Sequence, residues 1–149
     1  MQRVERTARL AAPPEEVFAY VSNLDHLAEW QSGVTRAQRT SDGEMRAGAT
    51  AEVTREMLGT AMTAPLLVTA YEPPRRLGIA SEVSGVKADA SLELVPAENG
   101  QATDLAFSME IRGSGLTSFM EPMIAGAAGG DIDTSLQRLQ QRFGSEAAR

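Results

Sequence analysis

The sequence predicts an α+β fold, in which a strongly curved antiparallel sheet holds one long C-terminal helix. Most of the chain alternates apolar and polar residues with the period of β-strands, and turn-forming residues separate these segments. The alternation is one-sided, so one face of the sheet is covered and the other faces water. The helical period from Thr117 to Phe143 marks the only element long enough to cover that face.

The first strand and two short helices are expected at the start of the chain. Residues 4–10 alternate as a strand does, although Arg6 shares the apolar side. Residues 13–16 end this strand and start a helix, because proline fits a first helical turn and glutamate suits the positive end of the helix dipole. A second short helix contains Trp30 and is expected to end near Ser32.

Turns separate six further strands. Asn99 and Gly100 form a strong turn signal, and Pro73 with Pro74 must interrupt a strand because proline cannot donate to the ladder. The last of the six strands has the most regular alternation in the chain. The expected strands span residues 34–40, 49–58, 62–72, 77–83, 86–95 and 103–112.

The final helix is expected to be weak in its middle. Ser118 and Glu121 have the spacing of a capping box at its start, and Gly144 is a natural stop. Residues 126–130 include three glycines, each of which costs about 1 kcal/mol relative to alanine inside a helix. A kink or break is therefore expected there, and a helix weakened at this point is a candidate gate.

Composition excludes several classes of function. The chain has 149 residues, which favours one domain over residues 1–149, and its hydrophobic content of 42% is enough for a core. Fourteen basic against twenty acidic residues give a net charge of −6, which argues against binding to nucleic acid. No apolar run reaches the length of a membrane span, so a cytoplasmic protein without integral membrane association is expected.

Metal and thiol chemistry are not expected either. The chain has no cysteine, which removes disulfides, thiolate nucleophiles and cysteine-based zinc sites. His26 is the single histidine and is expected to be exposed. Asp131 and Asp133 are expected to start the second half of the last helix rather than to act as acid or base. The sequence therefore indicates no metal site, no cofactor and no catalytic residue.

Four stretches of the chain resemble a known superfamily. They are APPEEVFAYVSNLDHLAEW at residues 12–30, GV at 33–34, YEPPRRL at 71–77 and LQRLQQRF at 136–143. They look like the START-like superfamily, also called SRPBCC or Bet v 1-like, and in particular its bacterial polyketide cyclase/dehydrase-like branch. The resemblance covers residues 4–143. It implies a helix-grip fold, with a seven-stranded antiparallel sheet around the long helix and a cavity between them for an apolar ligand.

The residues expected to face this cavity come from the apolar side of the strands and from the last helix. Four methionines are among them, and methionine is common at adaptable binding surfaces. Alanine and glycine on the helix leave space that larger residues would fill. Trp30 is either a packing anchor or a wall against the ligand. The candidate ligand-binding residues are Trp30, Val53, Arg55, Met57, Leu66, Val68, Ile79, Phe107, Met109, Met120, Met123, Ile124 and Ala127.

Arg55 is the most informative of these residues, because alternation places it on an otherwise apolar face. Its side chain either reaches water at the end of the strand or anchors a carboxylate, phenolate or carbonyl in the cavity. A buried guanidinium without a partner costs too much free energy, so a buried Arg55 requires an acidic partner or a ligand.

Three classes of function remain open. The first is the binding or transport of a small hydrophobic molecule, lipid-like or polyketide-like, by a monomer or weak homodimer. The second, which the resemblance allows, is a polyketide cyclase or aromatase that would use Arg55, Tyr71 or a serine. The third is a protein-interaction module, since some relatives resemble toxins or chaperone activators.

Overall fold

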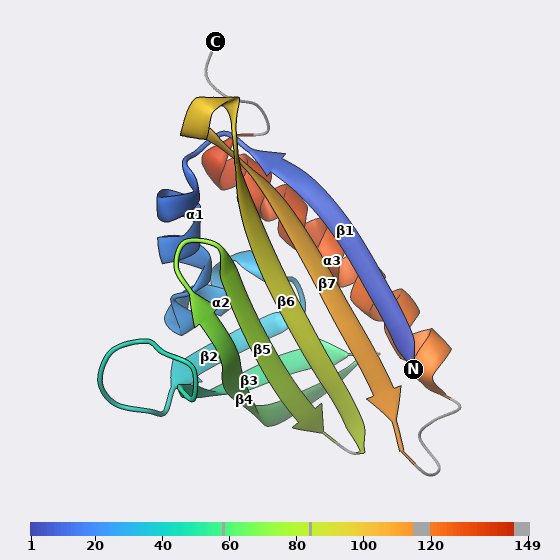
Figure 1. Ribbon diagram of the computed structural model, residues 1–149. Helices are drawn as coiled ribbons and strands as arrows, with labels where there is room; N and C mark the ends of the chain where they lie inside the picture. The colour runs from blue at the N-terminus through green and yellow to red at the C-terminus, as the bar shows by residue number, and fades with distance from the viewer. Residues whose placement is uncertain (58, 84, 115–119, 145–149) are drawn as a thin grey trace.

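The computed structural model describes residues 1–57, 59–83, 85–114 and 120–144. A seven-stranded antiparallel sheet, two short helices after the first strand and one long C-terminal helix confirm the predicted α+β fold (Figure 1). The elements are β1 (Gln2–Leu10), α1 (Pro14–Val21), the 3₁₀ turn η1 (Leu24–His26), α2 (Leu27–Trp30), β2 (Val34–Arg39), β3 (Thr50–Met57), β4 (Thr60–Glu72), β5 (Arg76–Val83), β6 (Val86–Ala97), the 3₁₀ turn η2 (Glu98–Gly100), β7 (Ala102–Gly113) and α3 (Glu121–Phe143).

The order of the strands explains how one helix can cover the sheet. The strands lie in the order β1-β7-β6-β5-β4-β3-β2, so the first strand pairs with the last, with Arg6 opposite Phe107. The sheet bends strongly, because β2, β3 and β4 lie across one end of the molecule at a steep angle to β6 and β7 (Figure 1). α3 lies behind β1 and β7 and contacts both strands.

α3 is continuous from Glu121 to Phe143, so the kink expected at its glycines is wrong. Gly129 lies against β1, where a Cβ atom would stand 3.2 Å from Nη2 of Arg6. The guanidinium of Arg6 lies over the helix at this point, with its Nε 2.9 Å from Oδ1 of Asp133. Packing against the sheet holds the helix together where intrinsic propensity is low.

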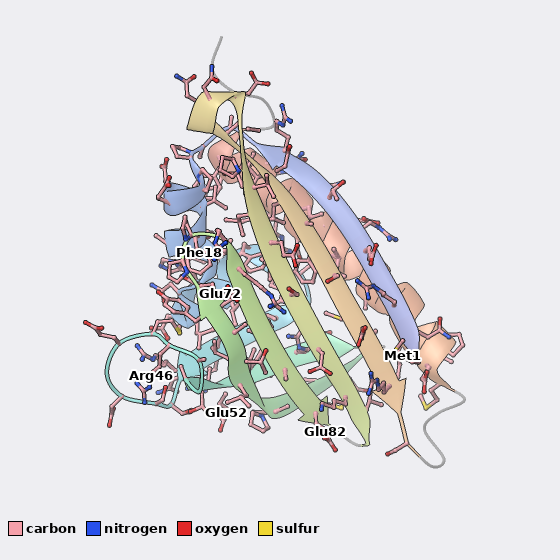
Figure 2. All side chains as sticks on the ribbon, in the orientation of Figure 1. Met1, Phe18, Arg46, Glu52, Glu72 and Glu82 are labelled. Atoms are coloured by element: carbon pink, nitrogen blue, oxygen red, sulfur yellow. The ribbon has the colours of Figure 1, made fainter. Side chains whose placement is uncertain are left out.

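The start of α3 is tied to the sheet by Glu121. Its buried carboxylate accepts a hydrogen bond from the backbone N–H of Gly113 at 2.9 Å and pairs with the N-terminal ammonium of Met1 at 2.6 Å. Figure 2 shows Met1 beside this end of the helix. The capping box predicted at Ser118 lies outside the described residues, while Pro122 takes the expected place in the first turn.

The core is solid at the end of the sheet that α1 and α2 cover. Trp30 and Phe107 are almost fully buried there and meet edge to face, with 6.4 Å between ring centroids. Phe18 of α1 meets the ring of Tyr71 at 5.5 Å. His26 is half-buried rather than exposed, because it stacks on Tyr20 at 4.8 Å. No helix among the described residues is long and apolar enough to cross a membrane.

Candidate functional site

A cavity of about 430 Å³ lies between the sheet and the first half of α3. Its walls are mostly apolar, and its polar side chains come from the connection after α2, from strands β3, β4 and β5, and from α3. The lining residues are Gln31, Ser32, Arg55, Thr60, Met62, Ser81, Val86, Ala88, Met109, Ile111, Met120, Ile124, Ala128, Asp131, Ile132 and Ser135. This volume falls within the range of about 300–1,000 Å³ that small-molecule sites occupy.

The cavity occupies one end of the sheet, beyond the point where side chains of the core cover the strands. On β7, Phe107 is fully buried in the core, while Met109 and Ile111 line the cavity on the same face two and four residues later. Ala88 on β6 pairs with Ile111, so both reach the same end of the sheet. Figure 2 marks the two ends, with Phe18 beside α1 at one end and Glu82 near the end of β5 at the other.

Arg55 brings a positive charge to the cavity wall. Its strand β3 pairs with β4 so that Arg55 is opposite Met62, and both residues line the cavity. Burial lowers the pKa of the guanidinium from its ordinary value, and the Asp131 carboxylate acts in the opposite direction. Within the part of the chain that the structure describes, no hydrogen bond or ion pair joins the Arg55 side chain to another residue. Arg55 therefore remains available to a ligand.

Asp131 and two serines form the polar cluster on the helix side. Oδ1 of Asp131 accepts a hydrogen bond from Oγ of Ser32 at 3.1 Å. Oγ of Ser135 donates to the backbone oxygen of Asp131 at 2.6 Å and accepts from the backbone N–H of Ser32 at 2.8 Å. The bonds of Ser32 to Asp131 and Ser135 join α3 to the connection after α2, and the first of them holds the Asp131 carboxylate.

Gly33 leaves the space that Asp131 needs. Its φ is +89°, and a Cβ atom there would stand 3.0 Å from Oδ2 of Asp131. The backbone oxygen of Gly33 accepts a hydrogen bond from the N–H of Glu56 at 2.7 Å, which places the turn directly beside Arg55 on β3. Glycine is thus required by both the backbone conformation and the close approach of the helix.

Four of the residues expected at the cavity line it, and six pack elsewhere in the core. Arg55, Met109, Met120 and Ile124 belong to the lining. The other six are core residues outside the lining: five lie on the covered face of the strands, and the sixth lies on α2. They are Trp30, Val53, Leu66, Val68, Ile79 and Phe107, each at most 5% exposed. For Trp30, the structure supports the packing interpretation.

The remaining three expected residues do not line the cavity in the described part of the chain. Met123 is 56% exposed on the outer side of α3, because the helical period turns Met120, Ile124 and Ala128 inward instead. Ala127 is half-buried, one position before the lining residue Ala128. The side chain of Met57 lies outside the described residues.

Sequence reasoning missed Asp131, Gln31 and Met62. Asp131 follows Ile124 and Ala128 at helical spacing, a signal that the expected break at the glycines concealed. Met62 has the same parity as Leu66 and Val68 on its strand, so extending that alternation would have found it. Gln31 follows Trp30 directly and carries no periodic signal.

The described residues include neither a candidate metal site nor a tyrosine in the cavity lining. They contain no group of three histidine, aspartate or glutamate side chains placed to hold a metal ion. Tyr71, named for the cyclase alternative, packs on Phe18 and does not belong to the lining. Polar chemistry in the cavity is therefore confined to Arg55, Asp131, Gln31 and hydroxyl groups.

A bent antiparallel sheet around one C-terminal helix, with a cavity between them, defines the START-like class of helix-grip proteins. Within that class, the chain belongs to the family described as "Polyketide cyclase / dehydrase and lipid transport", whose model matches residues 1–144.

Individual relatives are distant in sequence but match along almost the whole chain. The chain is 25% identical over 145 residues to a Mycobacterium tuberculosis H37Rv protein named Toxin Rv0910, covering 96% of this chain and 99% of that protein. A START superfamily protein from Mycobacterium smegmatis has a similar structure, with a TM-score of 0.76, 17% identity and 95% and 96% of the two chains covered. The Zhui aromatase/cyclase from Streptomyces sp. R1128 gives a TM-score of 0.79 at 11% identity, with 99% of each chain covered. At these identities the two structures establish the fold alone.

Proposed function

We propose that the protein binds one small, largely apolar molecule in the cavity between the sheet and α3, and that Arg55 holds a polar group of this molecule. The observation that carries the proposal is a mostly apolar cavity of about 430 Å³ with an unpaired guanidinium in its wall. An apolar chamber with a few placed polar groups is typical of small-molecule sites.

The chemistry of Arg55 indicates what the ligand carries. A desolvated guanidinium without a partner is unfavourable, and a carboxylate, phenolate or carbonyl oxygen on the ligand would relieve that cost. Asp131 lowers the cost in the empty protein without forming an ion pair with Arg55. The proposed ligand therefore has an acceptor at one end and an apolar body against Met109, Ile124 and Ile132.

Two other functions have specific support. The family description names cyclase and dehydrase activity, and the guanidinium of Arg55 would stabilise the oxygen of an enolate in such a reaction. The name of the 25% identical relative favours a toxin-like interaction role. The expected cytoplasmic location and the expected monomer or weak homodimer stay predictions.

Native mass spectrometry of protein purified from its own host tests the proposal. Binding predicts a co-purifying mass of a small molecule that is retained by the folded protein and released on unfolding. Turnover of a poly-β-ketone mimic would support the cyclase instead, and a bound macromolecule with an empty cavity would support the interaction role. Protein that stays empty, even with small acids added in excess, would contradict the proposal.

A further inference from the structure

Asp131 offers a carboxylate oxygen to the cavity in addition to the guanidinium of Arg55. Its Oδ1 accepts a hydrogen bond from Ser32, whereas Oδ2 has no hydrogen bond among the described residues. The fully enclosed side-chain atoms without a partner, such as Oε1 of Gln31 and Nδ1 of His26, include neither Oδ2 of Asp131 nor a nitrogen of Arg55. These atoms therefore keep accessible surface, and both side chains line the cavity.

The turn at Gly33 brings the two charged side chains to the same end of the cavity. A Cβ atom on Gly33 would stand 3.0 Å from Oδ2 of Asp131 and 3.5 Å from the backbone oxygen of Glu56, the residue after Arg55 on β3. Val34, the residue after Gly33, pairs with Arg55. No ion pair joins Arg55 to Asp131 among the described residues. The space between this donor and this acceptor can hold a ligand group that bonds to both.

The charges of the lining balance each other. Arg55 and Asp131 are the charged side chains among its described residues, one positive and one negative. A ligand carboxylate would bring a second negative charge beside Asp131, between mostly apolar walls where charges are poorly screened. A neutral ligand adds no such repulsion. The charge balance of the cavity therefore favours a neutral head group over an anionic one.

From this placement we infer that the ligand has a neutral head group in which an acceptor oxygen, held by Arg55, adjoins an N–H or O–H donor, held by Oδ2 of Asp131. The inference rests on the proposed function and narrows its ligand class to neutral groups of the carboxamide type. A guanidinium can only donate and an ionised carboxylate can only accept, so the head group must do both. Each of the two hydrogen bonds has an ionised partner, which strengthens it.

The test compares three ligands with the same alkyl chain. Decanamide carries the acceptor and the donor, 2-undecanone replaces the amide nitrogen by a methyl group and keeps the carbonyl, and decanoate carries acceptors and a negative charge at neutral pH. We expect wild-type protein to bind decanamide about tenfold more tightly than 2-undecanone, which corresponds to about 1.4 kcal/mol. Decanamide should also bind more tightly than decanoate. Isothermal calorimetry measures the three affinities.

The variant Asp131→Asn keeps the size of the side chain and removes its charge. It should weaken the binding of decanamide and strengthen that of decanoate, so the ratio of the two affinities should fall by about tenfold or more. Asp133→Asn is the matched control, because it removes the same charge from α3 at an exposed position outside the lining, where Asp133 pairs with Arg6. The ratio should remain at its wild-type value in this control.

Three results would overturn the inference and leave the proposed function standing. They are equal binding of decanamide and 2-undecanone to wild-type protein, tighter binding of decanoate than of decanamide, and an affinity ratio that Asp131→Asn does not change. If none of the three ligands binds, the proposed function fails and the inference fails with it.

Discussion

Arg55 on β3 and Asp131 on α3 line the same cavity without forming an ion pair. Both carboxylate oxygens of Asp131 lie against the turn after α2. Oδ1 accepts a hydrogen bond from Oγ of Ser32, and Oδ2 lies beside Gly33, which has no side chain. The carboxylate is therefore held by the turn after α2 and only moderates the cost of burying Arg55. A closed ion pair would leave neither group for a ligand, whereas this arrangement leaves the guanidinium available.

The first prediction concerns Arg55→Met. Hydrogen bonds to charged groups contribute about 1.5–3 kcal/mol, so affinity for decanoic acid should fall by about tenfold or more. The unfolding temperature of the empty protein should stay the same or rise, because a desolvated charge is removed. Arg36→Met, the same change at an exposed position of β2, is the control and should alter neither quantity. Unchanged affinity in Arg55→Met would show that Arg55 does not hold the ligand.

A second prediction concerns the volume of the cavity. Ala128→Leu places a larger side chain in the lining and should weaken ligand binding by about tenfold or more, with no loss of stability, because it fills empty space. Ala127→Leu makes the same change one position earlier, outside the lining, and should leave the affinity unchanged. Isothermal calorimetry with decanoic acid measures both. A larger effect at Ala127 than at Ala128 would contradict the placement of the cavity.

The glycines of α3 supply a third prediction. Gly126 and Gly130 have open space where a Cβ atom would lie, so alanine at either position should stabilise the protein by about 1 kcal/mol in urea denaturation. Gly129→Ala should gain less, because its Cβ would displace the guanidinium of Arg6 from Asp133. Equal gains at all three positions would mean that the contact with β1 does not constrain the helix. Ligand rates unchanged by these substitutions would argue against the gate expected from the glycines.

The fourth prediction concerns acid stability. Nε and Nη2 of Arg9 donate to the two carboxylate oxygens of Asp104 at 2.7 and 2.9 Å, and this hydrogen bonding lowers the pKa of Asp104. The folded protein thus binds this proton less readily than the unfolded chain, so the contribution is present above the unfolded pKa, near 3.9, and is lost as pH falls through the folded value. Asp104→Asn should be slightly less stable than wild type at pH 7, a small effect because both side chains are half-exposed. A difference in unfolding temperature that does not shrink as the pH falls from 7 to 2 would contradict this.

The sequence was sufficient to predict the fold, because period and turn signals depend on local residues. The strand alternation correctly placed Arg55 and Met109 on the covered face. It could not say how far along that face the packed core ends. Phe107 and Met109 have the same parity on β7, and only the positions of α1 and α2 decide that the first is in the core and the second lines the cavity.

The helix side of the site was harder to predict for a different reason. Low propensity at Gly129 suggested a break, but contact with Arg6 and Val4 on β1 keeps the helix continuous. Asp131 was consequently read as a cap, although it is in the middle of α3 and lines the cavity. Tertiary packing overrode local preference at the residues that matter most for the site.

The central claim is that an apolar molecule enters the space between the sheet and α3, and the methionines report on it directly. Met62, Met109 and Met120 line the cavity, whereas Met1 and Met123 are exposed away from it. When the methionine methyl groups are labelled with ¹³C, titration with decanoic acid should shift the NMR signals of Met62, Met109 and Met120. The signals of Met1 and Met123 should stay in place. Shifts confined to Met1 and Met123, or no shift at saturating acid, would contradict the account.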